Sequence, residues 1–196
     1  MRRPNEQLAE KRKNQILQAA ARCFVRSGFH NTGMQEICKT ADMSPGAVYR
    51  YFASKDAIIE AIVAQEQHEF TTELEKISRA RSFKKALLDF VEQLTLDISE
   101  PDYNVIATEI IAEAARNKKV ADIIAKTEQQ STVILTRLIR TEVENGRLHL
   151  SLSVTETAQT ILSLAYGCST QILLNPKLSA KKLARLARKV VEQIIS

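Results

Sequence analysis

Tyr49 and Arg50 carry side chains that could hydrogen-bond to base edges in a DNA groove. They follow Gly46 and Ala47, two small residues that would let a helix backbone approach a base closely. Arginine in particular can make the paired hydrogen bonds that distinguish guanine from the other bases. These residue types at this spacing indicate noncovalent readout of DNA.

The residues upstream predict a short helix and a tight turn that lead into this segment. Thr32 and Gln35 have the spacing of a capping box, so a first helix is expected to begin directly after Thr32. Ile37 and Ala41, four residues apart, form its buried stripe. Asp42 follows where the chain must turn, and aspartate tolerates the left-handed backbone that a tight turn requires.

A second helix is predicted from Pro45 to about Tyr51. Ser44 is a favourable N-cap, and proline suits the first helical position. Val48 and Phe52, at i and i+4, face inward, which leaves the groove-reading residues on the other faces. The alternative is a helical hairpin that makes no DNA contact, since such hairpins are common in helical proteins.

Positive charge is concentrated in the first quarter of the chain. Residues 1–55 hold ten Lys and Arg against four Asp and Glu, a balance of +6, whereas residues 56–196 hold 18 against 19, a balance of −1. The whole excess of +5 therefore lies where phosphates would be met. The leading basic residues, Arg2 and Arg3 with Lys11, Arg12 and Lys13, are expected to form a frayed, solvated arm in the absence of DNA. With DNA present, this arm could enter the minor groove or contact the backbone.

The stretch from Lys13 to Ala61 resembles the N-terminal DNA-binding domain of TetR-type transcriptional regulators, the TetR/AcrR family. The resemblance depends on an F-x-x-x-G-F element, the helix-turn-helix and a Y-x-Y-F-x-S-K run, whose residues are Phe24, Gly28, Phe29, Tyr49, Tyr51, Phe52, Ser54 and Lys55. Gly33 and Asp42 depart from the family pattern, in which Thr or Ser is common at the first position and Gly at the second. Further along, the runs EAIVAQEQ and EIIAEAARN are most similar to the glucuronide-operon repressor subgroup.

The resemblance implies roles for individual residues of the helix-turn-helix. Thr32, Tyr51 and Lys55 are expected to bond phosphates, and residues at the start of the second helix are expected to face the major groove. The complete expected DNA-binding set is Thr32, Ser44, Pro45, Gly46, Ala47, Tyr49, Arg50, Tyr51 and Lys55.

The chain as a whole predicts an all-α protein. We expect an N-terminal three-helix helix-turn-helix DNA-binding domain over residues 1–54 and a larger helical effector-binding and dimerisation domain over residues 55–196. Caps and breakers predict the later helices at about 55–79, 83–99, 102–116, 119–145, 154–174 and 179–195. Gly146 is predicted to end the fourth of these as its C′ residue.

The last two predicted helices carry wide apolar stripes. The stripes either pack inside one subunit or pair across a two-fold axis as a four-helix bundle, which the resemblance also implies. We favour the homodimer, because a helix-turn-helix that reads two half-sites requires two-fold symmetry. The expected interface residues are Ile161, Leu164, Ala165, Ile172, Leu183, Leu186, Ala187, Val190, Val191 and Ile194.

The resemblance also implies a small-molecule effector cavity among the central helices. Glu109 and Glu113, four apart on an otherwise apolar segment, would lie on one helix face, where they could attract a cationic or hydroxyl-rich effector. Alternatively, Glu113 is held by Arg116 or by a neighbouring helix. The complete candidate set is His68, Phe70, Tyr103, Glu109, Glu113 and Tyr166.

Motifs and composition argue against several other classes of protein. The three His residues have no Cys or Ser partner in a recognisable catalytic motif, so neither an enzyme nor a cofactor is expected. Cys23, Cys38 and Cys168 are far apart, which indicates neither a disulfide framework nor a metal site, and the first two are expected to be small core residues. No signal peptide and no apolar run of roughly 20 residues is present, so we expect a cytoplasmic, nucleoid-associated protein without a membrane partner.

These features favour a sequence-specific, ligand-responsive transcriptional repressor. Its homodimer would occupy double-stranded DNA at a pseudo-palindromic operator and leave it when a small-molecule effector binds. A helical protein-interaction scaffold without DNA readout is an alternative, but it does not explain why positive charge collects around a capped helix. An activator of the same fold is a second alternative.

Overall fold

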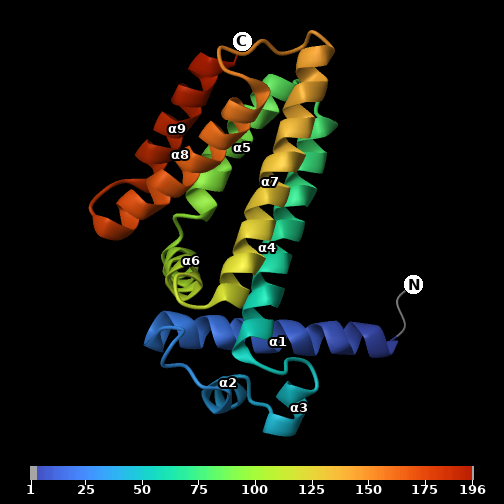
Figure 1. The fold of residues 1–196 in the computed structure, drawn as a ribbon, viewed down its shortest axis with the longest axis vertical. Helices are drawn as coiled ribbons and strands as arrows, with labels where there is room; N and C mark the ends of the chain where they lie inside the picture. The colour runs from blue at the N-terminus through green and yellow to red at the C-terminus, as the bar shows by residue number, and fades with distance from the viewer. Residues whose placement is uncertain (1–3, 196) are drawn as a thin grey trace. The chain divides into compact units, whose positions relative to one another are not determined.

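The computed structural model of this chain describes residues 4–195 and is built from α-helices (Figure 1). The helices are α1 (Pro4–Ser27), α2 (Met34–Thr40), α3 (Pro45–Tyr49), α4 (Lys55–Ser78), α5 (Phe83–Asp97), α6 (Pro101–Ala114), α7 (Lys118–Glu144), α8 (Val154–Leu174) and α9 (Ala180–Ile194). An isolated antiparallel bridge joins Leu150 to Ile195. The prediction of an all-α fold is confirmed. Arg2 and Arg3 of the expected arm lie outside the described residues, whereas the expectation of a frayed arm is wrong for Lys11, Arg12 and Lys13, which lie within α1.

Side chains and glycines at the helix ends explain why the helices start and stop where they do. The Ser44 side chain accepts a hydrogen bond from the backbone N–H of Ala47, as predicted for an N-cap. At the end of α7, Gly146 has a φ of 67°. The Gly146 N–H bonds the Val143 carbonyl, and the Arg147 N–H bonds the Glu142 carbonyl. This pair of bonds is the Schellman motif, which fits the prediction of Gly146 as the C′ residue.

One cap was missed and one was predicted wrongly. Ser153 and Glu156 form a complete capping box at the start of α8, and their S-x-x-E spacing could have identified it. The capping box predicted at Thr32 is wrong, because the N-cap of α2 is Gly33 and no side chain caps it. Thr32 is only 1% exposed, and its hydroxyl instead donates to the Gly28 carbonyl at 2.8 Å.

Two compact units share the chain. The first comprises Met1–Gln65 with Val105–Ala125, and the second comprises Glu66–Asn104 with Lys126–Ser196. Helices α4, α6 and α7 each contribute residues to both units. The compact units are therefore not the two continuous segments expected from sequence, and a functional boundary after residue 54 stays a prediction.

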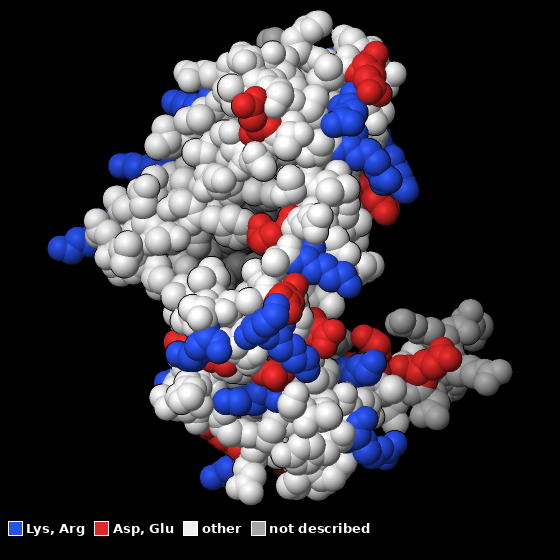
Figure 2. Space-filling view, in the orientation of Figure 1, with Lys and Arg blue, Asp and Glu red and all other residues white. Residues whose placement is uncertain are grey.

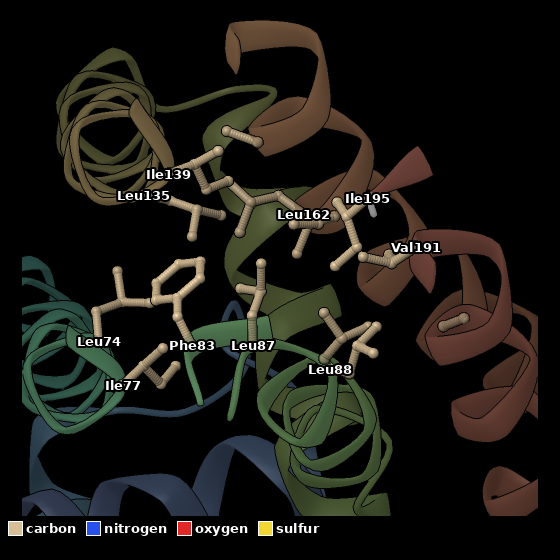
Figure 3. Close-up of a cluster of buried hydrophobic side chains, with 14 of the residues drawn as sticks. Leu74, Ile77, Phe83, Leu87, Leu88, Leu135, Ile139, Leu162, Val191 and Ile195 are labelled. Carbon is tan, nitrogen blue, oxygen red and sulfur yellow. The ribbon is translucent and has the colours of Figure 1, made fainter. Parts of the chain in front are cut away.

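Each unit has its own apolar core. In the first unit, Phe24 of α1, Ile37 of α2 and Val48 of α3 pack with residues of α4, α6 and α7 such as Ile58 and Val120. Cys23 and Cys38 are buried in this core, as predicted. The core of the second unit is drawn in Figure 3, where side chains of α4, α5, α7, α8 and α9 meet: Leu74, Ile77, Phe83, Leu87, Leu88, Leu135, Ile139, Leu162, Val191 and Ile195.

The apolar stripes of α8 and α9 divide into a buried part and an exposed part. Helix α9 packs on α5 and α8 within the subunit. Four residues expected at the dimer interface are fully covered by this packing and are unavailable to a partner chain: Ile161, Ala165, Ala187 and Val191. Partly buried members of the expected set are Leu164, Ile172, Leu183, Val190 and Ile194, whereas Leu186 is 53% exposed.

Leu135→Ala should strongly destabilise the protein. Leu135 is fully buried in the second core, and truncation of a buried leucine costs about 2 to 5 kcal/mol through lost burial and a residual cavity. Urea unfolding at a fixed protein concentration measures the loss. Val133→Ala on the same helix is the matched control, because Val133 is 57% exposed and its truncation should change the free energy of unfolding by less than about 1 kcal/mol. Equal effects of the two substitutions would contradict this assignment of the core.

Candidate nucleic-acid interface

Helix α3 presents a short exposed surface above a buried anchor. Val48 is fully buried and Phe52, just after the helix, is nearly so, which fixes the helix on the first core. Tyr49, 50% exposed, and Arg50 therefore project into solvent. Nothing lies within 4 Å of where a Cβ on Gly46 would stand, so the backbone at the start of the helix is open to close approach. The helix, its inward anchors and its exposed residues are as predicted, and their contact with DNA stays a prediction.

The turn between α2 and α3 depends on Asp42. This residue has a φ of 52°, in the left-handed region predicted for it. Its backbone N–H bonds the Lys39 carbonyl, and the N–H of Met43 bonds the Cys38 carbonyl at 3.1 Å. A non-glycine residue therefore adopts the conformation that the family usually gives to glycine, and the turn is intact despite the carboxylate.

Polar contacts fasten α2 to α1. Arg26 of α1 forms an ion pair with Glu36 of α2 at 2.6 Å, and this hydrogen bond lowers the pKa of the Glu36 carboxyl. Gln15 donates its side-chain amide to the Ala41 carbonyl at 2.7 Å, which satisfies the end of α2. These contacts, with the shared apolar core, position α2 and the turn that follows it. Figure 1 shows α2 and α3 as the two short helices next to α1.

The corner between α1 and α2 is held by charged residues from distant parts of the chain. Gly28 ends α1 with a φ of 75°, and its N–H bonds the Phe24 carbonyl at 2.9 Å, an αL cap. The next peptide N–H, that of Phe29, donates to Glu109 Oε2 at 2.7 Å. The Phe29 carbonyl accepts from Lys55 Nζ at 2.8 Å.

Two of the residues expected to bond phosphates are therefore engaged inside the protein. Thr32 is buried, as described above, and Lys55 Nζ also bonds the His30 carbonyl and lies 4.5 Å from the centre of the Phe29 ring. Burial lowers the pKa of Lys55 from its ordinary value. Tyr51 is partly buried against the first core. Phosphate contacts by Thr32, Tyr51 and Lys55 remain predictions.

Charge on the surface of the first unit is mixed. On the face shown in Figure 2, Lys and Arg side chains lie beside Asp and Glu side chains over the helices around α1. The excess of basic residues in the first 55 positions is thus not gathered into one continuous patch on this face.

The two carboxylates predicted for the effector cavity both lie in the first unit. Glu109 bonds the Phe29 backbone, so its place beside the helix-turn-helix was not foreseen. Glu113 is nearly buried and accepts hydrogen bonds from Arg116 at 2.7 Å and Asn117 at 3.3 Å. The alternative in which Arg116 holds Glu113 is therefore the one observed.

The other effector candidates lie in the second unit. His68 is exposed, and the Phe70 ring packs edge-on against Phe90 with ring centres 5.7 Å apart. Tyr166 donates to Glu128 Oε1 at 2.7 Å. Tyr103 donates to Glu66, a contact between α6 and α4.

Glu66 and Glu128 were not identified from the sequence. Burial, followed by the neighbouring carboxylates, raises the pKa of both tyrosines, Tyr103 and Tyr166. Burial also raises the pKa of Glu66. The Tyr–Glu partners are separated by tens of positions on different helices, so no spacing in the sequence could have paired them.

Metal-binding clusters and membrane-spanning helices are absent from the part of the chain that the structure describes. No group of three or more His, Cys, Asp or Glu residues within 4–195 is arranged to hold a metal ion. None of the described helices is both long enough and apolar enough to cross a membrane.

Comparison with known proteins agrees with the helix-turn-helix geometry. Residues 16–62 match the family of bacterial regulatory proteins described as the tetR family, and residues 84–196 match the C-terminal domain of BetI-type transcriptional repressors. The HTH-type transcriptional regulator UidR of Escherichia coli K12 is 28% identical over 179 residues, which cover 91% of this chain and 87% of that protein. UidR is the glucuronide-operon repressor, so the predicted similarity to that subgroup is confirmed.

Solved structures share the fold over nearly the whole chain. Salmonella enterica GusR superposes with a TM-score of 0.77 at 26% identity and covers 93% of this chain and 94% of its own. A SmeT–triclosan complex superposes with a TM-score of 0.78 at 20% identity, covering 93% and 90%. With both of its parts matched, the chain belongs to the TetR family of bacterial regulatory proteins and carries a BetI-type repressor domain after its helix-turn-helix.

Proposed function

We propose that the protein is a transcriptional repressor whose homodimer occupies a pseudo-palindromic operator and is released by a small-molecule effector. The geometry of α3 supports DNA readout most directly. Ser44 caps this helix and Val48 anchors it in the core, while Tyr49 and Arg50 are exposed and the backbone at Gly46 is open. A protein-interaction scaffold has no need for this combination. TetR-family membership supports the same function.

The proposed groove contacts come from α3 and from the two residues that flank it. Arg50 and Tyr49 read base edges, while Pro45, Gly46 and Ala47 allow the helix start to approach the bases, with Ser44 as the cap that holds this start. Lys55 and Tyr51 would meet the phosphate backbone. Lys55 Nζ already bonds two carbonyls, but an ammonium has three donors and one remains for a phosphate.

The proposed dimer interface consists of the exposed apolar residues of α8 and α9. Leu186 of α9 is joined by Leu173 and Leu174 near the end of α8, all of them exposed in the isolated chain. Large apolar side chains exposed on neighbouring helices favour a contact with another chain. A two-fold dimer would place its recognition helices at half-sites roughly 34 to 36 Å apart, about one turn of DNA.

The proposed effector contacts in the second unit are Glu66, Tyr103, Glu128 and Tyr166. They converge from α4, α6, α7 and α8. Within residues 4–195, neither Glu66 nor Glu128 forms an ion pair with Lys or Arg, which leaves carboxylate charge available to a ligand. Two carboxylates with two phenol groups suit a cationic or hydroxyl-rich molecule. The SmeT–triclosan complex shows that a protein of this fold holds a small molecule.

Arg50→Ala should weaken binding to the operator far more than binding to random duplex DNA. A good arginine contact to a base discriminates by roughly 1 to 3 kcal/mol, and its loss should relax preference at one base pair of each half-site. Competition binding against operator variants, with salt concentration held fixed, measures the change. Arg137→Ala, an exposed arginine of α7 in the second unit, is the control and should leave both affinities unchanged. Equal losses on operator and random DNA would reassign Arg50 to the phosphate backbone.

Leu186→Asp should convert dimers into folded monomers. The side chain is exposed in the isolated subunit, so a carboxylate there is tolerated by the fold, but it would be buried unpaired at the proposed interface at a cost of several kcal/mol. Sedimentation measures the mass and circular dichroism the helix content. Leu152→Asp, also exposed but outside α8 and α9, should remain dimeric. A dimeric Leu186→Asp protein with full operator affinity would place the interface elsewhere.

Cationic and polyhydroxy probes should stabilise the protein more than anionic ones. A ligand that binds only the folded state raises the melting temperature through mass action. Benzyltrimethylammonium, glucose and glucuronate at equal concentration form the test set for thermal shift assays. Glu128→Gln should reduce the shift caused by the cation. Stabilisation by glucuronate that survives in Glu128→Gln would contradict the proposed contacts.

A further inference from the structure

We propose that Glu109 is a positioning residue for DNA recognition, because its carboxylate holds the backbone corner from which the helix-turn-helix leaves α1. Glu109 belongs to α6, far from the reading residues in sequence, and no DNA contact is proposed for it. The inference rests on the proposed function, since its consequence is measured as operator binding. Glu109 would act on DNA recognition only indirectly, by fixing the orientation of the Phe29 backbone.

The Phe29 residue is held between two opposite charges. Its N–H donates to the Glu109 carboxylate at 2.7 Å and its carbonyl accepts from the Lys55 ammonium at 2.8 Å. Hydrogen bonds with an ionised partner are shorter and roughly twice as strong as neutral ones. A residue bonded on both sides in this way has little freedom to rotate about its own backbone. The direction in which the chain leaves α1 is thereby set.

The glycine that precedes Phe29 leaves room for the Glu109 carboxylate. A Cβ built on Gly28 would stand 3.1 Å from Glu109 Oε2, tighter than ordinary contact, and the φ of 75° already disfavours other residues. The glycine therefore serves two purposes: it ends α1 and it admits the carboxylate.

The corner leads within a few residues to the reading elements. The Gly28 carbonyl accepts from both the backbone N–H and the hydroxyl of Thr32, at 3.2 and 2.8 Å, and α2 begins at Met34. A shift of the Phe29 peptide would therefore be passed to the start of α2. Because α2 packs against α3, the recognition helix would shift with it.

Loss of the Glu109 contact should leave the unit folded. The Phe29 side chain is buried in the first core and packs against Phe24 with ring centres 5.1 Å apart. Arg26 and Gln15 also fasten α2 to α1 independently of the corner. The residue is therefore anchored by its ring, while Glu109 controls only the orientation of its backbone.

The test compares three variants on a duplex selected from the protein's own genome. In Glu109→Ala the acceptor is lost, in Glu109→Gln an uncharged acceptor remains, and Ile110→Val removes one methyl from a neighbouring buried side chain without touching the corner. Fluorescence anisotropy gives the operator dissociation constant, calorimetry gives the melting temperature, and amide hydrogen exchange of Phe29 reports the bond itself.

We expect Glu109→Ala to bind operator about tenfold more weakly and to speed exchange of the Phe29 amide, the size expected for one lost charge-assisted hydrogen bond. Glu109→Gln should recover part of the affinity. Ile110→Val should bind operator within about twofold of the parent affinity, even if its melting temperature falls as far as that of Glu109→Ala.

Operator affinity that is unchanged in Glu109→Ala, despite faster Phe29 exchange, would overturn the inference. So would affinity losses that simply follow the melting temperature in Glu109→Ala and Ile110→Val alike, because the effect would then be one of stability. Failure of the unmodified protein to bind any duplex in a salt-sensitive manner is a separate result, which would reject the proposed function itself.

Discussion

The direction in which the chain leaves α1 is set at Phe29, whose N–H donates to Glu109 and whose carbonyl accepts from Lys55. A helix that ends needs partners for its last carbonyls and a defined direction for the chain that follows. The αL cap at Gly28 supplies the partners, and the two charged side chains supply the direction. Since one comes from α4 and the other from α6, the corner exists only when these helices are packed beside α1.

The helix-turn-helix segment is too small to bury a stable core alone. Domains near 50 residues bury a smaller fraction of their surface than larger domains do, and they are marginal unless other elements contribute. Here Ile58 and Ile59 of α4, Ile110 of α6 and Val120 of α7 join the same core as Val48. The compact unit therefore includes Val105–Ala125, although that segment lies far from the helix-turn-helix in sequence.

The second unit has an apolar core, and two Tyr–Glu pairs lie outside this core. Leu87, Leu135 and Ile161 form part of the continuous apolar cluster of the bundle helices. The Tyr103–Glu66 pair keeps a carboxylate in surroundings that penalise charge, so burial raises the pKa of Glu66, and Tyr166 donates to a second carboxylate, Glu128. Groups held in this way are costly for stability, and their retention is typical of sites that recognise ligands.

The sequence by itself determined the helices, the Asp42 turn, the Ser44 and Gly146 caps, and the inward stripes of Val48 and Phe52. These features depend on residues within a few positions of one another, so periodicity and capping rules predict them. Motif spacing likewise identified the TetR family. It did not identify the positions of Glu109 and Lys55, nor the partners Glu66 and Glu128, because these contacts join residues tens of positions apart. Only tertiary packing brings Glu109 to the Phe29 N–H, which lies 80 positions away in sequence, whereas Arg116 lies about one helical turn from Glu113 and was within reach of a local rule.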